Sequence, residues 1–148
     1  MWTVYSENRL LKWQAFRRAL SLLIFEDAVK EASHLWSYAP MTTKFASFSV
    51  QPMPNPWELI LKSRYNDFEK AYGIITTLYF TTHGTEHKFE LRGVKVNSNL
   101  EPYNLVVIDE GKYILNYVFD TVVSNEQLEK DYEVLYTYSD STLCLNKY

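Results

Sequence analysis

The first 40 residues repeat apolar side chains at the three- and four-residue spacing that is typical of amphipathic helices. Leu10, Trp13 and Leu20 follow this spacing after Ser6, a residue type that often caps a helix. A second repeat runs on to Pro40, which disfavours helical backbone in the residue before it. The pattern predicts two helices, over residues 7–20 and 22–38.

Two further helices are expected in the middle of the chain. Pro56 suits the first turn of a helix, and Asn66 with Asp67 opens a longer apolar repeat. Gly73 weakens that repeat, and the β-branched run 74–77 could instead begin a strand. We favour a helix there. The predicted helices cover residues 56–63 and 66–81.

From residue 87 onward the pattern changes to the two-residue alternation of strands. Gly93 shifts the alternation by one residue, as a β-bulge does, and Glu110-Gly111 lies between two apolar runs as a hairpin turn. A capped helical turn is expected over residues 124–131. The predicted strands cover residues 87–96, 103–109, 112–119, 133–139 and 142–146. Helices followed by a mainly antiparallel sheet make the fold class α+β.

The length of 148 residues corresponds to one domain, so we predict a single domain over residues 1–148. Four of the five prolines fall between Pro40 and Pro56, and this segment is expected to be an irregular surface loop. Ordered loops on a rigid scaffold often carry recognition, which makes this loop a candidate partner surface. The longest apolar runs are much shorter than a membrane span, so no membrane contact is expected.

The net charge of −3 divides unevenly along the chain. Residues 1–100 carry 12 basic and 9 acidic side chains, and residues 101–148 carry 3 and 9. A dense basic stripe is missing, which argues against direct nucleic-acid binding. The acidic cluster either keeps the surface solvated or steers a basic partner or a second copy into register. Its candidate interaction residues are Glu126, Glu129, Asp131 and Glu133.

Aromatic residues are abundant, with 12 Tyr, 8 Phe and 4 Trp against 4 glycines. A domain of this length is expected to leave several of these rings exposed, where they favour protein–protein contacts. Trp57 is the candidate interaction residue among them. Its place in the first helical turn after Pro56 fits either a ring that packs onto the core or an exposed anchor for a partner.

No catalytic, cofactor or metal motif stands out in the sequence. The single cysteine, Cys144, lies in a predicted buried strand, where a thiol is expected to be inert. His83 and His87 have a spacing that would align two metal ligands on a helix, but the onset of a strand argues against a helix there. The four glycines are isolated, so a phosphate-binding loop is not expected. We therefore predict no catalytic residue, no cofactor and no metal.

Several segments resemble a family of small proteins of tailed bacteriophages. They are residues 6–10 with Trp13, Phe16 and Arg17; Trp36 with Ala39-Pro40; residues 54–60; residues 71–74 with Tyr79; and residues 103–106 with 111–116. The resemblance implies a structural or adaptor protein at a tail, neck, baseplate or head interface, and not an enzyme. Its partners would be other phage structural proteins and copies of itself, and its location the host cytoplasm during synthesis and then the virion. The alternatives are a phage protein outside the virion that binds a host factor, or a cysteine-independent enzyme.

A second resemblance is to the transglutaminase-like and papain-like folds. In these folds a helix that bears Cys precedes a strand that bears His and a strand that bears Asp or Asn. The helix start at Asn66, the strand at Tyr103-Asn104 and the strand at Asn116 follow this order. The resemblance implies a scaffold in which these positions hold amide side chains, which supply neither a nucleophile nor a base. On that scaffold the chain is expected to be catalytically inactive.

Overall fold

The computed structural model describes residues 1–3, 6–42, 53–128 and 130–148. Its helices are α1 (Ser6–Ser21), α2 (Phe25–Ser37), α3 (Pro56–Leu59) and α4 (Asp67–Tyr79). Its strands are β1 (Phe89–Val96), β2 (Pro102–Ile108), β3 (Tyr113–Leu115) and β4 (Tyr132–Ser139). Helices precede the sheet along the chain, so the predicted α+β class is confirmed.

The four strands form one antiparallel sheet in the order β3-β2-β1-β4. The register between β1 and β4 shifts by one residue between Gly93 and Val94, which confirms the predicted bulge at Gly93. Gly93 is paired with Asn104 of β2 on one side and with Tyr136 of β4 on the other. These three residues form one row across the sheet.

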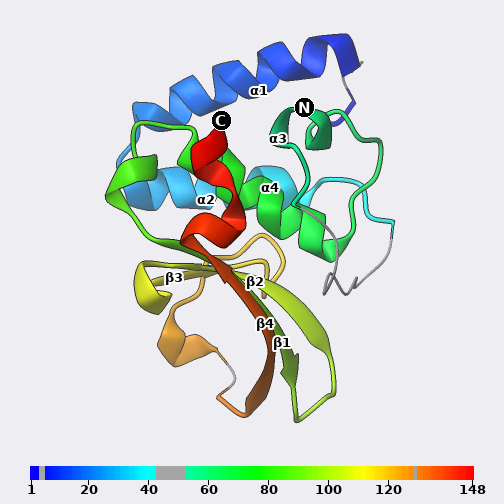
Figure 1. Cartoon of the computed structure of the whole chain (residues 1–148), viewed down its shortest axis with the longest axis vertical. Helices are drawn as coiled ribbons and strands as arrows, with labels where there is room; N and C mark the ends of the chain where they lie inside the picture. The colour runs from blue at the N-terminus through cyan, green and yellow to red at the C-terminus, as the bar shows by residue number, and fades with distance from the viewer. Residues whose placement is uncertain (4–5, 43–52, 129) are drawn as a thin grey trace.

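The helices are stacked on one face of the sheet (Figure 1). α4 lies next to the sheet with α2 beside it, and α1 lies across their far side. Leu91, Val106 and Leu115 of the sheet join the helices in the main hydrophobic core. α4 is buried along almost its whole length, as expected for a helix between two layers.

Two tryptophans from different helices form hydrogen bonds to the same threonine of α4. Trp13 of α1 and Trp36 of α2 each donate their indole N–H to Oγ1 of Thr77 in α4, at 3.0 and 2.9 Å. The Trp36 ring lies so close to Gly73 that an added Cβ would come within 2.4 Å of it. Gly73 weakens the helical pattern in the sequence, but close packing of α2 on α4 requires a glycine there.

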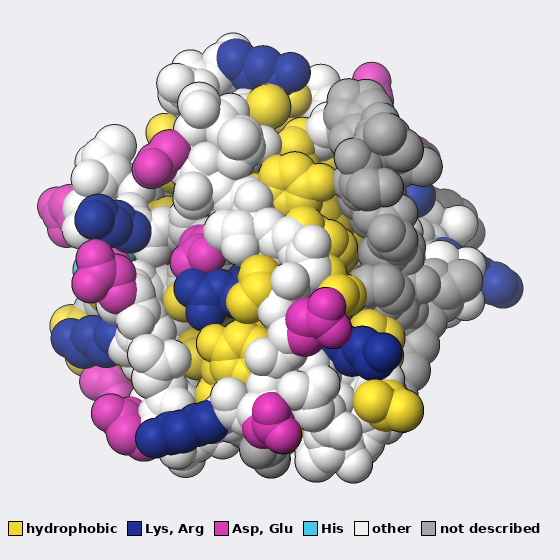
Figure 2. All heavy atoms as spheres, turned by 60° about the horizontal axis from the view of Figure 1, so that its bottom comes forward, with side chains coloured by type: hydrophobic (Ala, Val, Ile, Leu, Met, Phe, Trp, Pro, Cys, Tyr) yellow, Lys and Arg dark blue, Asp and Glu magenta, His cyan; other side chains and the backbone are white. Residues whose placement is uncertain are grey.

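The opposite face of the sheet has its own small core, closed by the segment between β3 and β4. A short 3-10 turn, Asn125–Gln127, begins in this segment with Ser124 as its cap, in agreement with the predicted helical turn. At the end of the molecule away from the helices, apolar side chains reach the surface between charged groups (Figure 2). The buried residues of this second core are Val94, Leu105, Val107, Ile114, Val123 and Leu128.

Two of the predicted boundaries are wrong. β3 ends at Leu115 rather than near residue 119, because Asn116 has left-handed backbone (φ +65°) and leaves the extended conformation. α3 ends at Leu59 rather than near residue 63.

The expected last strand over residues 142–146 is also wrong. This part of the chain forms two short 3-10 helices, Asp140–Leu143 and Leu145–Lys147, separated by Cys144 with φ +58°. The left-handed backbone at Cys144 prevents a continuous strand. Cys144 is half-buried and its Sγ lies 3.8 Å from the carbonyl oxygen of Thr142, so it is not the buried strand residue that the sequence suggests.

Of the predicted irregular loop over residues 40–56, the structure describes residues 40–42 and 53–56. Met41 forms an isolated bridge with Tyr65, and the Asn55 side chain caps α3. Residues 43–52 lie outside the described part, so the role of this loop as a partner surface stays a prediction. None of the described helices is long and apolar enough to cross a membrane.

Candidate functional site

The N-terminus of α4 is fixed by a reciprocal cap. The Asn66 side chain accepts a hydrogen bond from the backbone N–H of Glu69, and the Glu69 carboxylate accepts one from the backbone N–H of Asn66. This pairing satisfies two backbone groups that a helix start otherwise leaves open. It places Asp67 in the first turn of the helix, facing the sheet, where the helix dipole favours a negative charge.

The Asp67 carboxylate joins α4 to two segments of the sheet. Its Oδ2 accepts hydrogen bonds from the backbone N–H and the Nδ2 of Asn104, at 2.8 and 3.1 Å. Its Oδ1 accepts one from the Nδ2 of Asn116 at 3.1 Å. Three N–H donors therefore converge on one carboxylate, and Asn104 is fully buried.

Asn116 closes this arrangement from the residue just after β3. Its Nδ2 also donates to the carbonyl oxygen of Asn104 at 2.8 Å and lies 3.3 Å from the carbonyl oxygen of Asp67. Its left-handed backbone, with φ +65°, is one that asparagine tolerates better than most residues. The backbone at Asn116 ends β3 and turns the amide toward α4.

Tyr136 extends the cluster across the sheet. Its hydroxyl donates a short hydrogen bond to Oδ1 of Asn104. The ring passes over Gly93, where an added Cβ would lie 2.3 Å from it. Gly93 lies between Asn104 and Tyr136 in the sheet, so its missing side chain makes room for this contact. We call Asp67, Asn104, Asn116 and Tyr136 the α4 site.

Burial sets the protonation behaviour of the α4 site. It raises the pKa of the Asp67 carboxyl above its ordinary value, against the opposing effect of hydrogen bonds from Asn104 and Asn116 and the charge of Lys70. Burial, together with the charge of Asp67, also raises the pKa of the Tyr136 hydroxyl. Tyr136 is therefore a neutral hydrogen-bond donor.

The loop over residues 116–120 connects the α4 site to α2. The backbone N–H of Asp120 donates to Oγ of Ser37 at 3.0 Å, and the Asp120 carboxylate pairs with Nδ1 of His34 at 3.0 Å. Phe119 packs edge-on against Tyr38 with a centroid distance of 5.2 Å. Both rings remain open to solvent, Tyr38 at 57% and Phe119 at 65% exposure.

Trp57 lies where α1, α3 and the chain end meet. Its ring contacts Trp13, Phe80 and Tyr148 at centroid distances of 5.3, 4.9 and 6.0 Å. The ring still keeps 39% of its surface exposed. Trp57 thus packs onto the core and presents an edge to solvent, which leaves both sequence-based alternatives open.

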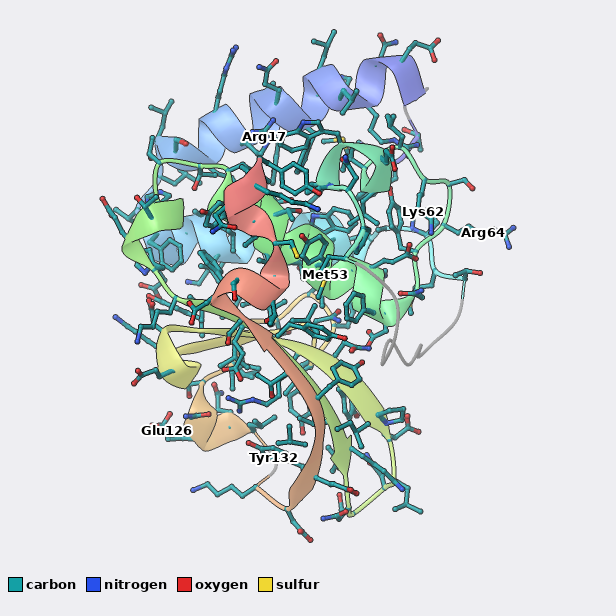
Figure 3. All side chains as sticks on the ribbon, in the orientation of Figure 1. Arg17, Met53, Lys62, Arg64, Glu126 and Tyr132 are labelled. Atoms are coloured by element: carbon teal, nitrogen blue, oxygen red, sulfur yellow. The ribbon has the colours of Figure 1, made fainter. Side chains whose placement is uncertain are left out.

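The three acidic candidates that the structure describes lie on separate segments. Glu126 is exposed on the 3-10 turn outside the sheet, at the end away from the helices (Figure 3), and a hydrogen bond from Ser124 lowers its pKa. Asp131 accepts a hydrogen bond from the Nδ2 of Asn97 at 2.8 Å, and Glu133 is exposed in β4 opposite Lys95. Glu129 lies outside the described residues.

His83 and His87 have separate partners. The Nε2 of His83 lies 3.2 Å from the carbonyl oxygen of Leu20, and the Nδ1 of His87 lies 2.6 Å from Oδ2 of Asp109. Among the described residues, no group of three or more His, Cys, Asp or Glu side chains is placed to hold a metal ion.

The structure brings together the three places that the second resemblance names, which are the helix start at Asn66, Asn104 and Asn116. The sequence pattern misses Asp67 as the central carboxylate, since Asn66 serves as the cap. It also misses Tyr38 and Phe119 as exposed rings, because residues 112–119 are interpreted as one strand. Asn and Asp at positions 116 and 120, which tolerate left-handed backbone, are the signal that could have indicated a loop there.

Comparison with solved structures identifies a similar fold in LapG of Legionella pneumophila. One LapG structure matches with a TM-score of 0.73 and 11% sequence identity, over 90% of this chain and 74% of LapG. Calcium-bound LapG matches with a TM-score of 0.71 and 10% identity, over 92% of this chain and 77% of that one. EGTA-treated LapG gives 0.66 and 10%, over 90% and 73%. No protein-family model and no curated protein sequence matches the chain.

LapG is a calcium-dependent cysteine protease with a transglutaminase-like, papain-like fold. This chain therefore has a fold that is used by an enzyme, and this finding contradicts the prediction that the chain is not an enzyme. The comparisons do not support the resemblance to a phage family. The resemblance to the transglutaminase-like fold is confirmed, and in this chain the fold brings Asp67, Asn104 and Asn116 into one hydrogen-bonded cluster.

Proposed function

We propose that this chain recognises a protein partner through an exposed aromatic surface on its transglutaminase-like scaffold, as an adaptor in a tailed-phage particle. The surface consists of Tyr38 at the end of α2 with Val118 and Phe119 of the 116–120 loop, and we call it the Tyr38–Phe119 patch. The partner would be another structural protein of the particle.

The observation that carries this proposal is the use of the α4 site to hold the 116–120 loop. Asn116 donates its amide hydrogens to Asp67 and Asn104 at one end of the loop. Asp120 is held by Ser37 and His34 at the other end. A loop fixed at both ends presents its side chains with little conformational entropy left to lose on binding.

The exposed rings support a protein partner rather than a small ligand. Tyr38, Val118 and Phe119 expose 57%, 45% and 65% of their surface on adjoining segments. Aromatic side chains of this kind are enriched in protein–protein contacts and supply most of the binding energy where they are central. The paired His34 and Asp120 beside them would give the patch a polar border.

The experiment measures incorporation into particles. In a phage that encodes this chain, mass spectrometry of purified virions first determines whether the unchanged protein is present at a fixed ratio to the other structural proteins. The variant Phe119→Ser is then supplied in its place. We expect a loss of about tenfold or more, since removal of a central aromatic anchor commonly costs more than 2 kcal/mol.

Leu100→Ser is the matched control, because Leu100 is also 65% exposed but lies in the turn between β1 and β2. Its incorporation should equal that of the unchanged protein. Equal incorporation of Phe119→Ser and Leu100→Ser would contradict the proposed patch. Absence of the unchanged protein from virions would contradict the virion setting and favour the alternative of a host-factor partner.

A further inference from the structure

A second group of polar residues lies at the start of β1, apart from the Asp67 cluster. The imidazole of His87 is held on one edge by Asp109, whose Oδ2 lies 2.6 Å from its Nδ1. One face of the ring stacks on Phe25 of α2, with a centroid distance of 3.5 Å and an interplanar angle of 7°. The position and the tilt of this histidine are therefore both fixed.

Asp109 is itself fixed in the turn that follows β2. Its second oxygen accepts a hydrogen bond from the backbone N–H of Lys88 at 3.0 Å, and its own backbone N–H donates to the carbonyl oxygen of Lys88 at 2.9 Å. Asp109 and Glu110 both have left-handed backbone, with φ of +52° and +61°. Non-glycine residues in this conformation are often found at functional sites.

The contact with Asp109 assigns the proton of a neutral His87 to Nδ1, which leaves the lone pair of Nε2 available. Among the described residues, Nε2 has no hydrogen-bond partner. A histidine held by a carboxylate at one nitrogen and open at the other has the arrangement of a general base.

His87 lines a pocket of about 290 Å³ that also contains Ser141. Pairing of Glu90 with Ser139 places the 3-10 turn after β4 beside the start of β1, and this turn carries Ser141. Ser141 is exposed, and its hydroxyl has no hydrogen-bond partner among the described residues. A residue with a free hydroxyl and a residue with a free imidazole nitrogen therefore line the same pocket.

The remaining walls of the pocket indicate the kind of group that it would accept. Most of the remaining lining is apolar or aromatic, and polar groups of both signs border it. The apolar and aromatic residues are Tyr79, Phe89, Leu143 and Leu145, and the polar ones are Lys88, Asn146 and the acidic Asp140. The volume lies just below the range of roughly 300–1,000 Å³ that is typical of small-molecule sites, so only a small group would fit. A short acyl chain fits these walls better than a long or strongly charged group.

We propose that Ser141, His87 and Asp109 form an acyl-transfer site for small esters, independent of the Tyr38–Phe119 patch. Ser141 Oγ attacks the ester carbonyl carbon while His87 Nε2 takes the hydroxyl proton. The bond from carbon to the leaving alkoxide then breaks, and the alkoxide leaves as an alcohol with that proton. Water hydrolyses the acyl-serine by the same route and restores both side chains. Asp109 orients the imidazole and stabilises its charged form.

The test uses a fluorophosphonate with a short alkyl chain on the full-length protein. Attack by Ser141 Oγ on phosphorus displaces fluoride and leaves a stable adduct, which mass spectrometry locates by peptide. We expect one adduct, on Ser141, and hydrolysis of p-nitrophenyl acetate that the adduct abolishes. His87→Gln should slow labelling by about a hundredfold or more, within the range for loss of a general base.

Matched variants separate this site from non-specific reactivity. Ser141→Ala should remove labelling, whereas Ser98→Ala, at another exposed serine, should leave it unchanged. Asp109→Asn should lower the maximal rate of labelling with little change in the concentration for half-maximal rate, as a positioning residue would. Circular dichroism confirms that each variant is folded. No adduct on Ser141, or labelling as fast in His87→Gln as in the unchanged protein, would overturn the proposal.

Discussion

The hydroxyl of Tyr136 reaches Oδ1 of Asn104 across Gly93, so that residues of three adjacent strands act as one unit. Asn104 in turn donates two hydrogen bonds to Asp67, the first residue of α4. The polar row thereby joins the edge strand β4 to the central helix. Because Asn104 is fully buried, each of its polar groups needs a partner. Asp67 and Tyr136 supply partners for its side chain, Asp67 also accepts from its backbone N–H, and Asn116 donates to its carbonyl oxygen.

The first prediction concerns the space above Gly93. Gly93→Ala should lower the free energy of unfolding by about 1–3 kcal/mol, because the new Cβ would lie 2.3 Å from the Tyr136 ring and force it to move. Denaturant unfolding measures this change. In a Tyr136→Ser background the same substitution should cost much less, because the ring is gone. An equal loss in free energy of unfolding in both backgrounds would show that the Tyr136 ring is not the reason for a glycine at position 93.

The second prediction concerns the pH dependence of stability. The pKa of Asp67 is higher in the folded state than its ordinary value of 3.8, so the folded state holds this proton more tightly than the unfolded state. That contribution to the free energy of unfolding is complete below the unfolded-state pKa and is lost as the pH rises through the folded-state pKa. The free energy of unfolding of the unchanged protein, minus that of Asp67→Asn, should therefore fall as the pH rises.

Chemical denaturation of both proteins from about pH 3 to about pH 7 measures this difference directly. The subtraction removes the contributions of the other titratable groups, which the two proteins share. If the difference in free energy of unfolding instead grew with pH, the prediction would be wrong. The hydrogen bonds from Asn104 and Asn116 would then outweigh the cost of burying the Asp67 carboxylate.

Local sequence signals predict much of the fold because they coincide with the tertiary packing. The helix start at Asn66 is recognised from its cap, and the bulge at Gly93 from a one-residue shift in the apolar pattern. The resemblance to a transglutaminase-like fold also names Asn104 and Asn116, and the structure shows that they are in contact. The closure of these places around Asp67 depends on long-range contacts that no local pattern contains.

The two wrong strand predictions have a common cause in left-handed backbone. Asn116 and Cys144 each interrupt an apolar run that looks like a continuous strand. Neither residue is glycine or proline, the two strongest signals for a turn. Because residues 112–119 are interpreted as one strand, the sequence does not identify Phe119 as an exposed ring on a loop.

The third prediction decides how Trp57 contributes. Its ring contacts Trp13, Phe80 and Tyr148 but remains 39% exposed. Trp57→Ala should lower the free energy of unfolding by about 2 kcal/mol, which is less than for a fully buried tryptophan. Urea unfolding measures the change. A loss close to zero would favour the exposed-anchor interpretation instead.

The fourth prediction tests whether the acidic side chains of residues 101–148 steer a partner by electrostatic attraction. Replacing Glu126 and Glu129 by Gln should slow assembly with a basic partner at low salt and have little effect at high salt, because salt screens exposed charges. The control replaces Glu7 and Glu86 by Gln; both are exposed on other segments, and the net charge changes by the same amount. If both pairs behave alike at every salt concentration, the acidic residues serve only to solvate the surface.

Hydrogen exchange in the variant Asn116→Gly tests most directly whether the α4 site holds the 116–120 loop. Glycine adopts the left-handed backbone at this position freely and removes only the amide that contacts Asp67 and Asn104. We predict that the backbone amides of residues 117–121 exchange about tenfold faster or more, since a hydrogen bond to a charged group contributes about 1.5–3 kcal/mol. Asn97→Ala, which removes an exposed contact with Asp131, should leave these amides unchanged. Unchanged exchange of residues 117–121 in Asn116→Gly would contradict the claim that the α4 site holds the loop that carries Phe119.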